Sequence, residues 1–64
     1  MEANKWNSVK DGFPNFNVKI LIMYRVAKEL GNVREFTTGK LTDEGFRDIR
    51  GNLINGEVVK WAYI

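Results

Sequence analysis

The chain has 64 residues, with ten Lys and Arg against eight Asp and Glu, so its net charge is only +2. It contains no cysteine and no histidine, which excludes disulfides, thiolate and imidazole metal ligands, and Cys–His or Ser–His catalysis. A chain of this length forms one small domain with no room for a deep substrate cavity.

The first predicted element is an irregular leader, residues 1–17. Pro14 has no backbone N–H and favours extended backbone at Phe13, and Asp11-Gly12 is typical of a turn. Apolar side chains are spaced through this polar stretch, and burying one of them contributes roughly 1.5–3 kcal/mol. We therefore expect the leader to be a lid that lays four apolar anchors across one face of a sheet: Trp6, Val9, Phe13 and Phe16.

Residues 18–30 have two interpretations. A helix would begin after Asn17 and end before Gly31. A strand would place apolar residues in strict alternation on one face, and its β-branched and aromatic residues favour this reading. The alternating residues are Val18, Ile20, Ile22, Tyr24 and Val26.

The next segment favours the strand. A two-residue turn at Gly31-Asn32 would start a hairpin with a fixed register. That register places Glu29 opposite Arg34 and Lys28 opposite Glu35, so that opposite charges meet. It also places Tyr24 opposite Gly39, an arrangement in which an aromatic ring covers a strand glycine.

Two further turns divide the rest of the chain. Residues 42–45, Thr-Asp-Glu-Gly, are typical of a turn, and Asn55-Gly56 is the strongest two-residue hairpin signal in the sequence. The sequence therefore predicts a mainly β fold in a single domain, residues 1–64, with the sheet in residues 18–64. We expect a single antiparallel meander of about four strands at 18–29, 34–42, 46–54 and 57–63. The alternative is an α+β fold with a helix at about 18–30.

No catalytic group is evident. Asp43 and Glu44 are adjacent carboxylates, but they lie in a predicted turn rather than across a cleft. Ser8 is the only serine and has no activating base in any recognisable motif. The stretch from Gly51 to Gly56 lacks the lysine and the following helix of a phosphate-binding loop. We expect no enzymatic activity, no cofactor and no bound metal.

The candidate binding residues combine cations and aromatic rings on the predicted second hairpin. They are Arg47, Arg50, Lys60, Trp61 and Phe46. A turn at Asn55-Gly56 would place Arg50 opposite Trp61 as a cation–π pair, and the group could stack on and neutralise single-stranded nucleic acid. The simpler interpretation places Trp61 in the core with the cations around it, because a small domain has few large apolar residues to spare.

The order of motifs resembles a known family. Trp6 is followed by Ser8-Val9-Lys10-Asp11, Pro14, the apolar run from Val18 and the terminal segment from Val58 to Ile64. In these features, over nearly the whole chain, the sequence is similar to the small phage and prophage proteins of domain of unknown function family 551. The resemblance implies a small β-rich protein encoded by a mobile element, and it implies no particular activity.

These observations predict a protein-binding module that acts through the edge or face of its sheet. A host protein, a defence component or a second copy of the chain is the expected partner, and a single-stranded nucleic acid is the alternative. The leader has no apolar core of signal-peptide length, and the run from Val18 to Tyr24 is too short to span a bilayer. Together with the lack of cysteine, this predicts a cytoplasmic protein, in the host cytoplasm if phage-encoded, without membrane association.

Overall fold

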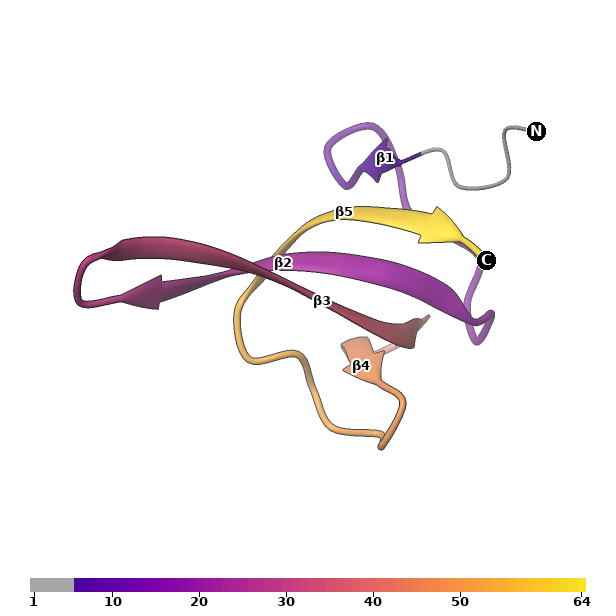
Figure 1. The fold of residues 1–64 in the computed structure, drawn as a ribbon. Coiled ribbons are helices and arrows are strands. Elements are labelled where there is room, and N and C mark those ends of the chain that lie inside the picture. Colours follow the sequence, from indigo (N-terminus) through magenta and orange to yellow (C-terminus); the bar gives the residue numbers. More distant parts are fainter. Residues whose placement is uncertain (1–5) are drawn as a thin grey trace.

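A single five-stranded antiparallel sheet makes up the fold (Figure 1). The computed structural model describes residues 6–64. The strands are β1 (Asn7–Ser8), β2 (Ile20–Lys28), β3 (Gly31–Thr42), β4 (Gly45–Asp48) and β5 (Glu57–Tyr63). The predicted all-β class and single antiparallel sheet are confirmed. The alternative helix at 18–30 is wrong, because β2 occupies this segment, and the described residues contain no helix that could cross a membrane.

The strand order differs from the predicted meander. It is β1-β5-β2-β3-β4, so β5 lies between β1 and β2 instead of pairing with β4. The strand predicted at residues 46–54 is observed as β4 and ends already at Asp48. Here the Asp48 carboxylate accepts hydrogen bonds from the backbone N–H groups of Arg50 and Asn52, and the chain turns. The inner position of β5 buries Trp61 on one face and Ala62 on the other. An edge strand could not bury both faces in this way, so packing overrides the Asn55-Gly56 turn signal.

The β2–β3 hairpin is present, but its register differs from the predicted one. The turn residues are Glu29 and Leu30, with Lys28 paired to Gly31. In this register Gly31 follows the turn and does not open it, and its φ of +125°, a value that L residues rarely adopt, favours glycine at this position. Tyr24 consequently lies opposite Glu35 and not opposite Gly39, a shift of four positions. The predicted charge pairs do not form, but an even shift keeps every residue on its expected face.

The hydrophobic core lies on one face of the sheet, which we call the core face. Its buried centre is Ile20, Ile22 and Trp61, and Val9 and Tyr24 are among the half-buried side chains packed against it. β2 and β5 are adjacent inner strands, so their inward side chains meet directly, with Ile22 opposite Trp61. The core of this small domain is therefore concentrated at two adjacent cross-strand rows, those of Ile20 and Ile22.

The leader crosses the core face and is held there by hydrogen bonds between its main chain and the sheet. The Trp61 Nε1 group donates a hydrogen bond to the Gly12 carbonyl at 3.0 Å. The Asn15 N–H donates to the Tyr63 hydroxyl at 3.0 Å, and the Asn17 N–H donates to the Leu41 carbonyl at 2.8 Å. Residues 9–17 thus pass from the β5 side of the sheet to the end of β3.

The leader is not anchored by the four side chains that the sequence suggested. Val9 packs on the core and Pro14 is buried, but Phe13 and Phe16 remain 66% and 60% exposed. Trp6 contacts Phe36, which lies on the opposite face of the sheet. Hydrogen bonds and a proline therefore replace most of the expected apolar burial. The first five residues of the predicted leader lie outside the described part of the chain.

Candidate binding surfaces

The two aromatic residues of the predicted site belong mainly to the core. Trp61 is only 7% exposed, lies between Asn7 and Ile22 in the sheet, and makes an edge-on contact with Tyr63. Phe46 is half-buried against the core cluster and contacts the ring of Phe13. Neither ring is presented on a surface where a base could stack. The structure thus matches the simpler interpretation of Trp61 as a core residue.

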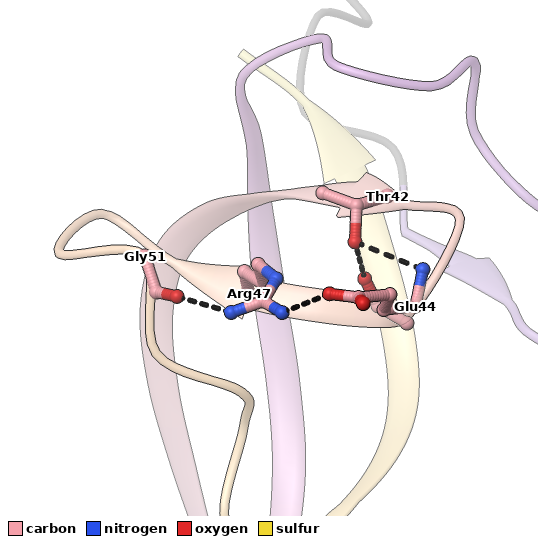
Figure 2. A network of polar contacts seen from close by, with 5 residues as sticks. Thr42, Glu44, Arg47 and Gly51 are labelled. Atoms are coloured by element: carbon pink, nitrogen blue, oxygen red, sulfur yellow. Dashed lines mark hydrogen bonds and ion pairs between the residues drawn. The ribbon is translucent and has the colours of Figure 1, made fainter.

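Arg47 is held in a local polar network at the end of β4 (Figure 2). Its guanidinium donates to the Gly51 carbonyl at 2.5 Å and forms an ion pair with Glu44. Thr42 fixes the same turn, because its hydroxyl donates to the Gly45 carbonyl and accepts from the Glu44 N–H. Arg47 therefore stabilises the β3–β4 turn and the loop after β4.

The structure does not bring the predicted cations into contact with one another. Arg50 lies in the exposed turn after β4, and its expected position opposite Trp61 is wrong because β4 and β5 are not neighbours. Lys60 is exposed on β5, opposite Ser8 on one side and Met23 on the other. Two strands, β2 and β3, separate it from Arg47 on β4. The five predicted residues thus do not form one binding surface.

A different surface emerges on the side of the sheet opposite the core face, which we call the basic face. Side chains alternate between the two faces along each strand, and the register fixes which residues share a face. Lys60, Met23 and Phe36 form one cross-strand row on this side, and Ala62, Leu21 and Thr38 form the next.

Charges in the strands are divided between the two faces. The basic face carries Arg25, Arg34, Lys40, Arg47 and Lys60. Among residues of the described strands, its only carboxylate is Glu57, which forms an ion pair with Arg25. Glu35 and Asp48 lie on the core face instead. Arg47 is paired with Glu44 from the neighbouring turn, so the positive charge of this face comes mainly from Arg34, Lys40 and Lys60.

Two aromatic rings lie among these cations. Trp6 and Phe36 have ring centroids 6.0 Å apart at an angle of 55°, and their exposed fractions are 37% and 61%. β5 and β2 separate β1 from β3, so this contact places the rings over the inner strands, where Met23 and Ala62 are buried. The rings thus cover a small apolar patch and keep part of their own surface exposed.

Sequence reasoning missed this surface, although a signal for it is present. In the segment from Val33 to Lys40, the residues Arg34, Phe36 and Lys40 recur with the two-residue period of one strand face. The predicted site was assigned instead from the Asn55-Gly56 turn, which sets no hairpin register. Trp6 could not be assigned, because the leader was expected to lie wholly on one face.

The outer edge of β3 is a second candidate surface. β4 pairs only with the segment from Gly39 to Thr42, and no described residue pairs with the outer edge of residues 31–38. In Figure 1 the β2–β3 hairpin projects well beyond β4. The β2–β3 hairpin has a two-residue turn closed by the pair Lys28–Gly31, and the β3–β4 hairpin has one closed by the pair Thr42–Gly45. In this geometry the even-numbered residues of β3 direct their N–H and C=O groups outward.

A tyrosine and a carboxylate meet on the core face within the β2–β3 hairpin. The Tyr24 hydroxyl donates a hydrogen bond to Glu35 Oε1 at 3.1 Å. Burial raises the pKa of Tyr24, and the hydrogen bond and the charge of Glu35 add to this effect. Within residues 6–64 no three His, Cys, Asp or Glu side chains lie close enough together to hold a metal ion.

Comparison with protein-family models, with curated protein sequences and with solved structures finds no match to this chain. The resemblance to family 551 therefore remains a prediction based on the motifs quoted above.

Proposed function

We propose that the protein is a non-enzymatic binding module that takes up an extended segment of a protein partner along the outer edge of β3. The observation that carries this proposal is the unpaired edge at residues 31–38. An exposed edge offers a row of main-chain donors and acceptors to which a partner strand can add. Three of the outward-directed residues, Arg34, Phe36 and Thr38, follow one another along this edge at the strand period.

The side chains of the edge would set which segment binds. Val33 and Glu35 flank it on the core face, and Arg34 and Phe36 flank it on the basic face. A partner strand with an acidic residue beside Arg34 and an apolar one beside Phe36 would match this pattern. A strand with a basic residue beside Arg34 would be rejected by like-charge repulsion.

The biological setting of this proposal follows from the sequence resemblance. A phage or prophage protein of this kind would act in the host cytoplasm on a host protein or a defence component. The exposed edge supplies the physical means of such an interaction and is compatible with several partners.

Proline substitution at the edge tests the proposal. Thr38→Pro removes an outward N–H without removing a donor from the β2–β3 ladder, whereas Thr38→Ala removes the same hydroxyl and keeps the N–H. Affinity capture from nuclease-treated host lysate should recover a protein with the parent chain and with Thr38→Ala, and lose it with Thr38→Pro. Circular dichroism should show that all three proteins are folded. Equal recovery by Thr38→Pro, or no recovered protein at all, would refute strand addition at this edge.

A further inference from the structure

We infer that the basic face binds single-stranded nucleic acid, with Trp6 and Phe36 stacking on bases and the surrounding cations neutralising phosphates. This inference uses side chains on one face of the sheet, and it does not depend on strand addition at the main chain of β3. It also differs from the interpretation suggested by the sequence, which relied on Trp61 and Phe46.

Charge complementarity identifies the chemical class of the ligand. Lys60, Arg34 and Lys40 are exposed on the basic face, and the ion pairs described for residues 6–64 involve none of them. Successive positions on one face of a strand are about 6.6–6.8 Å apart. Arg34 and Lys40 lie three such steps apart on β3, and Lys60 lies on β5 two strands away, so the cations are spread over the face and suit a polyanion better than a single carboxylate.

The aromatic pair indicates a single strand. Every base has a flat π surface, and stacking on a protein ring requires that this surface be free of its neighbours. Phe36 is the more accessible ring, at 61% exposed, and Trp6 supports it from the side at a centroid distance of 6.0 Å. Trp6 and Phe36 meet over the inner strands of the sheet, and bases that are stacked inside a duplex offer no free π surface to rings on such a face. Unpaired bases can instead lie flat against it.

The position of the cations relative to the rings completes the site. Lys60 lies in the same cross-strand row as Phe36, with the buried Met23 between them. Arg34 is two residues from Phe36 on the same strand and face, and Lys40 lies beyond Thr38 in the other direction. A strand of nucleic acid that stacks on Phe36 would therefore pass cations on both sides of the ring.

The binding test uses a fluorescein-labelled, mixed-sequence 12-nucleotide single strand, as DNA and as RNA, measured by anisotropy at about 50 mM salt. The matched duplex and a poly-glutamate peptide of equal charge serve as competitors. We expect the single strand to bind most tightly and the affinity to fall steeply with added salt. No binding at micromolar protein would overturn the inference. Equal competition by poly-glutamate would also overturn it and would point to an acidic protein ligand.

Matched variants test the location. Phe36→Leu keeps an apolar side chain but removes the ring, and should weaken binding about 5- to 150-fold, the range for loss of one stacked base. Lys60→Gln should reduce the slope of log K against log salt by about 0.7, as expected for one lost phosphate contact. Lys28→Gln removes the same charge from the core face at the hairpin end and should leave both quantities unchanged. Equal effects of Lys28→Gln and Lys60→Gln would show unspecific attraction and refute the proposed face.

Discussion

At the scale of single residues, the adjacent positions Lys60 and Trp61 show how strongly the two sides of one strand differ. Trp61 is buried in the core with its indole N–H bonded to the Gly12 carbonyl, whereas Lys60 is exposed. We expect Trp61→Ala to lower the free energy of unfolding by about 3–5 kcal/mol. Lys60→Ala should change it by less than about 0.5 kcal/mol. Urea denaturation of both variants measures this difference, and similar losses would contradict the burial of Trp61.

Gly39 is required for a reason that its sequence neighbours do not reveal. The sequence suggested that an aromatic ring covers it, but β4 is the close neighbour. A Cβ atom at position 39 would lie 2.0 Å from the Arg47 carbonyl oxygen and 3.0 Å from the Asp48 Cα. Gly39→Ala should therefore destabilise the protein by about 1–3 kcal/mol or more, because backbone must move. Thr38→Ala is the neighbouring control, and a thermal melt in which both variants lose equally little stability would contradict the close approach.

Tyr24 should make stability depend on pH in the alkaline range. Burial and the neighbouring Glu35 raise its pKa in the folded protein above the unfolded value of about 10. The folded state then holds this proton more tightly. The stabilising contribution is fully present below about pH 10 and is lost as the pH rises through the folded-state pKa. Urea unfolding between pH 8 and 11.5 should show a steeper decline for the parent chain than for Tyr24→Phe. Parallel curves would contradict the shifted pKa.

At the scale of elements, β3 combines a paired inner edge with an outer edge that is open over residues 31–38. Outward N–H groups at Arg34, Phe36 and Thr38 should exchange with solvent deuterium quickly, whereas those of Val33, Glu35 and Thr37 are directed to β2 and should be protected. Amide exchange followed by NMR would show this alternation in the free protein. Uniform protection along the segment would mean that the outer edge is already paired in solution.

The strands were predictable because their side chains alternate. Ile20, Ile22 and Tyr24 lie on the core face as the period of the sequence indicated, and β3 and β5 are close to their expected bounds. The turn at residues 29–30 was not predictable from its glycine, because Gly31 could be either the first residue of a two-residue turn or the residue that follows one. Local pattern thus determines the faces of these strands, whereas their partners depend on contacts that are distant in sequence.

At the scale of the whole molecule, the position of β5 decides which surfaces are available. β5 pairs with both β1 and β2, which leaves β4 at one edge and the long hairpin open beyond it. The basic face arises from the same arrangement, since Lys60 joins Met23 and Phe36 only when β5 lies beside β2. The β3 part of the candidate site is visible in the sequence as a two-residue period, but the addition of Lys60 could not be predicted because this non-local pairing has no turn signal.

The inner location of β5 also has a consequence for how the protein is made. β2 and β3 precede residues 57–63 in the chain, so a hairpin that forms first lacks Tyr63 and Trp61, the β5 residues that pair with Ile20 and Ile22. Pairing between residues this far apart in sequence makes folding slow, on the order of milliseconds to seconds. Until β5 arrives, both sides of the nascent hairpin are uncovered and prone to association with other chains. We expect the newly made protein to be most vulnerable to proteases and aggregation in that interval.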